Sequence, residues 1–313
     1  MVRRPLRVFV LTRRTTLLWR LLASFCCLVQ GRRLALLTGS TGTLGRALAK
    51  ALLSQQGHEE TLVCLGHRDP GKLDSLLCSL DKDPRALPFL HGDMSSLTDV
   101  SAATEALSAV VGDLRTFESV LLLNNAGVCL AGSSLQTLET SIRVNAMAPV
   151  VLARYLLGCL SLLQPHPPRL RVVNVSSGDG QLVYLDSTLS REVAGLDSLV
   201  EWHSFCEALI RDATSTLHAR QLAHGDTPAY SVSKALLNRG AWLLHREAAA
   251  SVASCSVVSV CPGNFQSPMS TPEEAEDSVS AADAAEGVLQ MCRHAVPDST
   301  PGGFYRFGRP IEF

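Results

Sequence analysis

The sequence predicts an α/β protein built on a parallel sheet, and three observations support this. Short apolar runs alternate with segments of helical periodicity from residue 33 onward. The runs are continuously apolar, which is typical of strands that helices cover on both faces. A glycine-rich turn directly follows the first run, as in folds that bind ligands at the carboxyl edge of the sheet. We therefore expect a doubly wound parallel sheet between two layers of helices.

Six strands are expected, each a run of apolar residues: 33–38, 61–66, 86–91, 119–124, 170–176 and 255–261. Helical spacing predicts helices between or after them: 44–55, 72–80, 97–111, 135–163 and 230–250. A further amphipathic helix is expected over 196–212, on the spacing of Leu199, Val200, His203, Cys206 and Ile210. Because no linker or repeat interrupts residues 33–313, we expect them to form one domain.

The composition narrows the class of protein. The chain has 313 residues, of which 46% are hydrophobic and 18% charged, with a net charge of −1. Such a balance gives no electrostatic reason to expect a nucleic-acid partner. The 10 cysteines are scattered, several lie in apolar runs, and none forms a C-x-x-C pair. We therefore expect reduced thiols in an intracellular protein and no metal site.

Residues 1–32 differ from the rest of the chain. They are rich in arginine, and no acidic residue appears before Glu59. An Arg-rich, acid-free amphipathic leader is typical of a mitochondrial presequence. A signal peptide or a membrane anchor, with membrane association through residues 1–30, is one alternative, although the apolar run from Leu21 to Val29 is too short to span a bilayer. An extra N-terminal helix of a cytosolic protein, with no targeting role, is the other. A reporter fused to residues 1–32 would distinguish them, since cytosolic or secreted reporter would contradict the presequence.

The glycine-rich turn after the first strand reads Thr38-Gly-Ser-Thr-Gly-Thr-Leu-Gly45. Gly39, Gly42 and Gly45 allow the chain to turn sharply and bring backbone N–H groups against a phosphate. The helix that follows points its positive end at the same place. Alone, such a turn is weak evidence, but its position between a strand and a helix favours dinucleotide binding.

The end of the second strand is where the adenine ribose of a dinucleotide should lie. It offers Gly66 and His67, followed by Arg68, rather than an acid for the ribose hydroxyls of NAD. A guanidinium at this point suits a 2′-phosphate. The alternative is a solvated loop arginine, which Asp69 could neutralise.

Tyr230 and Lys234 lie four residues apart in a helical stretch of a sequence that has only 4 tyrosines. Residues at this spacing share a helix face. A free phenol has a pKa of about 10, so it is a poor base at neutral pH. A neighbouring ammonium would favour the phenolate and lower that pKa, which makes the pair a candidate general acid/base rather than a surface pair.

Taken in order, the segments TGSTGTLG, NNAG, VNAMAP, VVNVSS, YSVSK and CPGNFQS resemble the motifs of the short-chain dehydrogenase/reductase family across about residues 33–313. The resemblance implies a single Rossmann-type domain that moves hydride between NAD(P) and a small-molecule carbonyl or alcohol. It implies that Tyr230 is the general acid/base and Lys234 its partner. Ser177 would orient the carbonyl, and Asn145 would belong to a proton relay.

The resemblance also assigns a set of cofactor-binding residues by motif position. They are Gly39, Thr41, Gly42, Thr43, Leu44, Gly45, Arg68, Asp93, Met94, Asn125, Ala126, Gly127, Tyr230, Lys234, Pro262, Gly263 and Ser267. With Arg68 among them, the expected cofactor is NADP(H) in preference to NAD(H).

Two features depart from the common family pattern. Thr43 stands where the family turn usually has glycine, and the turn has Gly42 instead, which puts the pyrophosphate contact in question. Ser177 and Tyr230 are 53 residues apart, an insertion that with the ending 302–310 resembles carbonyl reductase-like members. Retinol dehydrogenase-like members share most other motifs, and a cofactor-binding scaffold without turnover is the alternative from another class. The inserted helix should cover the usual dimer surface and keep the protein monomeric.

Overall fold

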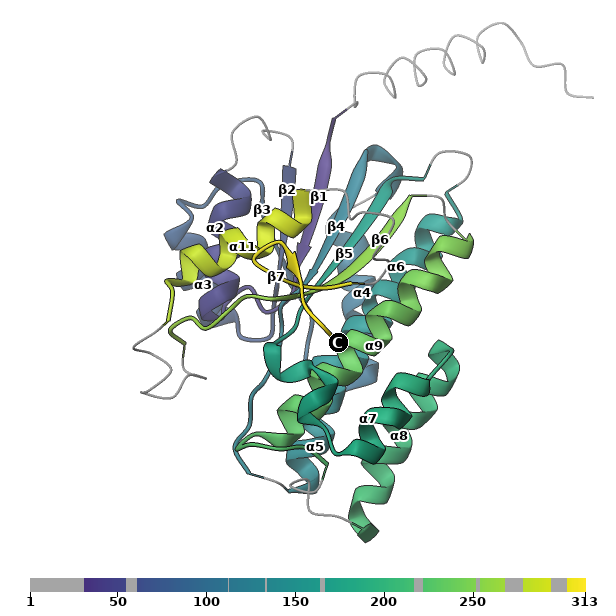
Figure 1. The fold of residues 1–313 in the computed structure, drawn as a ribbon. Helices are drawn as coiled ribbons and strands as arrows, with labels where there is room; N and C mark the ends of the chain where they lie inside the picture. Colours follow the sequence, from purple (N-terminus) through teal and green to yellow (C-terminus); the bar gives the residue numbers. More distant parts are fainter. Residues whose placement is uncertain are drawn as a thin grey trace, which may run out of the picture.

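The computed structural model describes residues 31–54, 61–111, 113–132, 134–163, 167–216, 222–251, 254–267, 278–293 and 303–313. The expectations for residues 1–30 therefore lie outside the described residues. Residues 31–313 contribute strands and helices that alternate along the chain, as Figure 1 shows.

A single sheet of eight strands forms the centre of the molecule, in the order β3-β2-β1-β4-β5-β6-β7-β8. All neighbours are parallel except β7 and β8. The strands are β1 (Arg33–Leu37), β2 (Thr61–His67), β3 (Ala86–Leu90), β4 (Ser119–Asn124), β5 (Arg169–Val175), β6 (Cys255–Cys261), β7 (Phe304–Arg306) and β8 (Arg309–Pro310). The chain order reverses at β1, so β1 and β4 create the switch point where ligands of such sheets bind.

Helices cover both faces of the sheet and create two separate hydrophobic cores. One face carries α2 (Thr43–Ser54), α3 (Pro70–Ser79) and α11 (Ala281–Arg293). The opposite face carries α4 (Leu97–Val111), α5 (Leu135–Ile142), α6 (Ala148–Ser161) and α9 (Pro228–Ser251). This arrangement confirms the predicted Rossmann-type parallel sheet, and the six expected strands agree with the observed ones to within a residue at each end.

The expected long helix over 135–163 has an interruption that its apolar pattern does not show. Residues Arg143–Met147 form a π-helix (η2) between α5 and α6. Single turns of this kind inside α-helices often mark functional sites. Asn145 lies at the centre of the interruption, fully buried.

The insertion between β5 and α9 contains two helices where one was expected: α7 (Ser187–Gly195) and α8 (Leu199–Thr216). The predicted apolar stripe of α8 is partly wrong, because Val200 is 68% exposed and His203 is also exposed. Trp202 takes their place in the core, with its Nε1 donating to the carbonyl of Leu236 at 2.8 Å. The buried indole of Trp202 therefore determines which face of α8 is turned towards the core, rather than the spacing of the smaller apolar residues.

Three elements of the C-terminal region were not predicted. β7 and β8 have three and two residues, which is too short for a periodic signal. The helix α11 could have been predicted from its apolar spacing, since one face carries buried residues: Ala284, Ala285, Val288 and Leu289. The stretch Leu135–Ser161 is apolar and long enough to span a bilayer by composition, but two thirds of it is buried within the fold, as expected of a core helix.

Candidate active site

The predicted turn brings two loops together at the carboxyl edge of the sheet. Gly39 has φ +62°, and a Cβ there would stand 2.7 Å from the Cα of Ala126. A Cβ on Gly45 would stand 2.2 Å from the carbonyl oxygen of Gly39. The chain after β1 therefore packs against both the loop after β4 and the first turn of α2, and only glycine fits at these two positions.

Hydrogen bonds from the loop after β4 fix this turn. The backbone N–H groups of Asn125 and Ala126 both donate to Thr38 Oγ1 at 3.0 Å. The Asn125 amide donates to the carbonyls of Thr38 at 3.0 Å and Gly39 at 3.1 Å. The side-chain nitrogen and the backbone N–H of Asn125 thus both hold the turn.

The turn retains donors for a phosphate. α2 begins at Thr43, so the first N–H groups of the helix have no partner within it. Gly42 and Thr43 are exposed, and a Cβ on Gly42 would meet only the Gly39 carbonyl, at 3.5 Å. The replacement of the usual glycine by Thr43 therefore costs no packing, and the exposed helix N-terminus fits a pyrophosphate.

The end of β2 fits the adenosine end of a dinucleotide. The side chain of His67 is buried and its Nδ1 has no hydrogen-bond partner in the described structure. Arg68 is exposed and forms no ion pair with any described residue. Asp69 does not neutralise it, because that carboxylate caps α3 by accepting from the N–H of Lys72 at 3.2 Å.

The residues after β3 are partly committed to their own loop. Asp93 accepts from the N–H of Ser95 at 2.9 Å. Hydrogen bonding by Ser95, with a smaller contribution from Arg68, holds the pKa of the Asp93 carboxyl below its ordinary value. Met94 is buried in the core. The remaining Asp93 oxygen and the Met94 backbone are what this loop can offer an adenine.

Ser177 and Tyr230 lie together, as predicted. The Ser177 hydroxyl lies close enough to the Tyr230 phenol to influence its ionisation. Burial raises the pKa of Tyr230 above its ordinary value, and Ser177 opposes this only in part. The predicted lowering of this pKa is therefore wrong for the protein without cofactor, because desolvation of the phenolate is the largest influence on it and raises it.

Lys234 extends from α9 beneath the tyrosine ring, with Nζ 5.6 Å from the ring centre. Nζ donates to the carbonyl of Val175, the last residue of β5, at 2.8 Å. Burial lowers the pKa of Lys234 to about 8. The ammonium faces the glycine of the β4 loop, since a Cβ on Gly127 would stand 3.7 Å from it. This glycine leaves open the space that a cofactor ribose would need.

Asn145 uses its whole amide within the protein. Oδ1 accepts from the N–H of Val128 at 2.8 Å, and Nδ2 donates to the Val128 carbonyl at 2.8 Å and to Ser233 Oγ at 2.9 Å. It contacts neither Tyr230 nor Lys234 by a hydrogen bond among the described residues. The side chain positions the loop after β4 against α9, and a part in a proton relay stays a prediction.

The turn after β6 completes the site. Pro262 is buried, and Gly263 has φ +77° with its Cα beneath the ring of Phe307. The N–H of Val279 donates to the Asn264 carbonyl at 2.9 Å, so the chain returns to the site after the loop that contains Ser267. The turns after β1, β4, β5 and β6 therefore lie at the same, carboxyl edge of the sheet, with Tyr230 and Lys234 of α9 beside them.

Several residues that shape the site were missed. Gly180 lies flat on α9, because a Cβ there would stand 2.9 Å from both Lys234 and Asn238. His91 Nε2 accepts from the N–H of Gly39 at 3.3 Å, and Arg46 Nε donates to the Thr41 carbonyl at 3.1 Å. Of these residues, only Gly180 could have been found from the sequence, because Gly178 precedes it by two residues. His91 and Arg46 reach the turn through contacts between distant parts of the chain.

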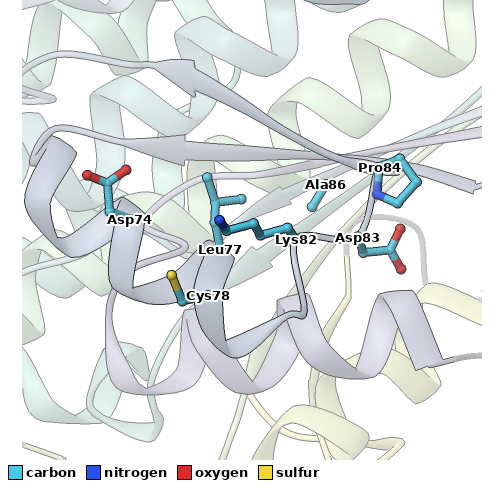
Figure 2. Close-up of a pocket in the computed structure, with 7 residues that line it drawn as sticks. All are labelled: Asp74, Leu77, Cys78, Lys82, Asp83, Pro84 and Ala86. Atoms are coloured by element: carbon cyan, nitrogen blue, oxygen red, sulfur yellow. The ribbon is translucent and has the colours of Figure 1, made fainter.

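A surface pocket lies away from these residues. It has a volume of about 410 Å³ and is lined by Asp74, Leu77, Cys78, Lys82, Asp83, Pro84 and Ala86, which Figure 2 shows between the end of α3 and the start of β3. That is the amino edge of the sheet, opposite the loops described above. It contains none of the predicted site residues, and we assign no function to it.

The chain matches a family of known proteins over its first strands and helices. The family model for short chain dehydrogenases matches residues 33–188. The human protein "Dehydrogenase/reductase SDR family member 13" is 26% identical over 193 residues, 61% of this chain and 47% of its own length. "Short-chain dehydrogenase/reductase iacJ" of Pestalotiopsis fici is 26% identical over 244 residues, 75% of this chain and 64% of its own length. The chain thus spans about half to two thirds of the curated relatives it matches.

Solved structures share the fold. Salutaridine reductase from Papaver somniferum has a TM-score of 0.67 at 21% identity, with 88% of this chain and 99% of that chain covered. The NADPH-bound carbonyl reductase from chicken fatty liver has a TM-score of 0.66 at 19% identity, with 90% and 99% covered. With its motifs, its fold and its family match in agreement, the chain is a member of the short-chain dehydrogenase/reductase family.

Proposed function

We propose that this protein is an NADP(H)-dependent oxidoreductase that reduces a carbonyl group on a small molecule. The observation that carries the proposal is the meeting of Ser177, Tyr230 and Lys234 beside the glycine-rich turn. A phenol, a hydroxyl and an ammonium at a dinucleotide-binding edge are the groups that carbonyl reduction needs.

Each residue has a distinct part in the proposed reaction. A bound nicotinamide would supply the hydride. Ser177 would hold the carbonyl oxygen, and Tyr230 would donate its phenolic proton to the developing alkoxide. Lys234, with its ammonium next to Gly127, would bind the ribose of the cofactor. Its positive charge would also stabilise the phenolate that Tyr230 becomes when it has donated its proton.

The part of Tyr230 as proton donor agrees with its raised pKa, since the phenol is protonated at neutral pH and can act as an acid. Binding of the cofactor is supported by the free helix N-terminus at Thr43 and the open space at Gly127. The preference for NADP(H) rests on the unpaired guanidinium of Arg68.

The test combines cofactor titration with a substrate panel. NADPH fluorescence should reveal binding, and aldehydes and ketones of varied size should then consume NADPH. Tyr230→Phe should lower the rate by about 10²–10⁴-fold, because general acid/base groups contribute that much, while cofactor binding stays nearly unchanged. Tyr184→Phe is the matched control and should keep its activity, since Tyr184 is exposed at the end of the short 3-10 helix η4 (Leu182–Tyr184).

Two results would contradict the proposal. Turnover by Tyr230→Phe above about a tenth of the wild-type rate would show that another group donates the proton. Binding of NADPH without reduction of any carbonyl would favour a cofactor-binding scaffold. The unusual Thr43 in the turn is the one feature that favours this alternative.

A further inference from the structure

The last strands of the sheet place an arginine beside the catalytic serine. Arg306 ends β7 at the carboxyl edge, and its Nε donates to Cys261 Sγ at 3.3 Å. A Cβ on Gly178 would stand 2.3 Å from the Arg306 NH2 group. The guanidinium therefore lies directly over the Cα of the residue that follows Ser177.

The backbone of the hairpin holds this arginine in place. Phe307 has φ +49°, an uncommon conformation for a residue other than glycine. Its ring rests on Gly263, where a Cβ would stand 2.5 Å from the ring. The hairpin is thus anchored on the turn after β6, and Arg306 is anchored on Cys261 at the end of the same strand.

The charge of Arg306 has no counterion among the described residues. Its one hydrogen bond goes to a thiol sulfur, which is a weak acceptor, and its side chain is exposed. Its cross-strand neighbour is Arg309, a second cation. Like charges directly opposite in a sheet are unfavourable, so this pair favours a bound anion.

We propose that Arg306 binds a carboxylate on the substrate, so that the preferred substrates are oxo acids. The inference rests on the proposed carbonyl reduction and adds a substrate class to it. A guanidinium presents two parallel donors that match a carboxylate. With its position over Gly178, Arg306 would hold the acid group while Ser177 and Tyr230 hold the carbonyl oxygen at the other end of the substrate.

The experiment uses the full chain with saturating NADPH and ω-oxo acids of about four to eight carbons, each with its methyl ester. Across this series the chain length samples the span between Arg306 and Tyr230. The wild type should reduce the best acid with a kcat/KM about 10–100-fold above that of its ester, as a charge-assisted pair provides. The difference should lie mainly in KM.

Three variants separate the contributions. Arg306→Gln should bring the acid close to the ester by raising KM for the acid, while kcat/KM for the ester stays within about threefold; this ester activity also shows that the variant folds. Arg306→Lys should keep part of the preference, since it keeps the charge and loses the paired donors. Arg115→Gln removes an exposed arginine that precedes β4, at the amino edge of the sheet, and should change nothing.

Clear results would overturn the inference. Equal kcat/KM for acid and ester in the wild type would do so, as would equal losses for both substrates in Arg306→Gln. A raised KM for NADPH in that variant would assign the guanidinium to the cofactor instead. If the wild type reduces no carbonyl at all, the proposed function itself fails. If it reduces the oxo group of acids, their methyl esters and neutral carbonyl compounds equally well, only the proposed role of Arg306 fails.

Discussion

At the scale of a single residue, the buried ammonium of Lys234 lowers the stability of the folded protein, because it loses its hydration. Its side chain is 4% exposed, and its partners are one carbonyl and the face of one ring. Burial lowers its pKa from 10.5 to about 8, which corresponds to about 3 kcal/mol of destabilisation below pH 8. A group retained at such a cost is expected to serve a ligand rather than the fold.

Lys234→Met should therefore stabilise the protein without cofactor at pH 7, by about 1–3 kcal/mol once the lost bond to Val175 is included. The wild-type penalty is fully present below pH 8 and disappears as the pH rises towards 10.5, where the unfolded state also loses the proton. Urea unfolding at pH 7 and about pH 10 measures this. A gain that is the same at both pH values, or a loss at pH 7, would contradict it, and the exposed Lys72→Met is the control.

Arg68 gives the cofactor preference a single test. A 2′-phosphate carries nearly two negative charges, and charge-assisted bonds to a guanidinium are worth ~1.5–3 kcal/mol in favourable cases. Solvent exposure reduces this, so we expect NADPH to be preferred over NADH by about 10–100-fold.

Arg68→Ala should remove most of that preference by weakening NADPH, with NADH little changed. Buried His67 would retain a small part through its unpaired Nδ1. The measurement is the ratio of kcat/KM for the two cofactors. Lys72→Ala, a cation in the first turn of α3, should leave the ratio intact. A wild-type ratio near one, or an unchanged ratio in Arg68→Ala, would show that Arg68 does not bind the phosphate.

At the scale of one element, the turn between β1 and α2 separates two glycines that look equivalent in the sequence. A Cβ on Gly45 would stand 2.2 Å from the carbonyl oxygen of Gly39, whereas a Cβ on Gly42 would stand at an ordinary contact distance of 3.5 Å from the same oxygen. The family resemblance treats both as cofactor-binding positions, but their structural demands differ.

Gly45→Ala should destabilise the protein by about 3 kcal/mol or more, since its Cβ would stand 2.2 Å from a backbone oxygen that cannot move without the turn. Gly42→Ala should unfold like the wild type, because its nearest neighbour is 3.5 Å away. Any change in this second variant should appear in NADPH affinity alone. Thermal unfolding of both proteins, with equal losses of stability, would argue against the distinction.

At the scale of the whole molecule, the insertion between Ser177 and Tyr230 determines which surfaces remain free. α8 packs against α5 and α9 and buries Trp202 on Leu236. Family members often pair through the helices that follow the fourth and fifth strands, here those around 135–163 and 230–250. The insertion covers part of that surface.

We therefore expect a monomer in solution. Light scattering at micromolar concentration should give a mass near 33.6 kDa. A mass of twice that value would show that the pair of helices still associates, or that the outer face of α8, with its exposed Val200, is itself an interface. Glu substituted for Val200 would distinguish the two, since it would dissociate only the second kind of dimer.

Much of the fold and the site could be read from the sequence because local patterns encode them. A strand buried on both faces has to be continuously apolar, so all six long strands were found in place. The ends of parallel strands meet at one edge, so residues as distant as Gly39, Ser177 and Tyr230 could be placed in one site.

The tertiary structure decided what depends on contacts between distant segments. The pKa of Tyr230 rises because burial disfavours the phenolate, and only the folded environment sets the extent of that burial. The rotation of α8 is set by the Trp202 bond to Leu236, and the place of Arg306 by the absence of a side chain at Gly178. Sequence spacing fixes which residues share an element, whereas desolvation and close packing depend on what the rest of the chain brings against it.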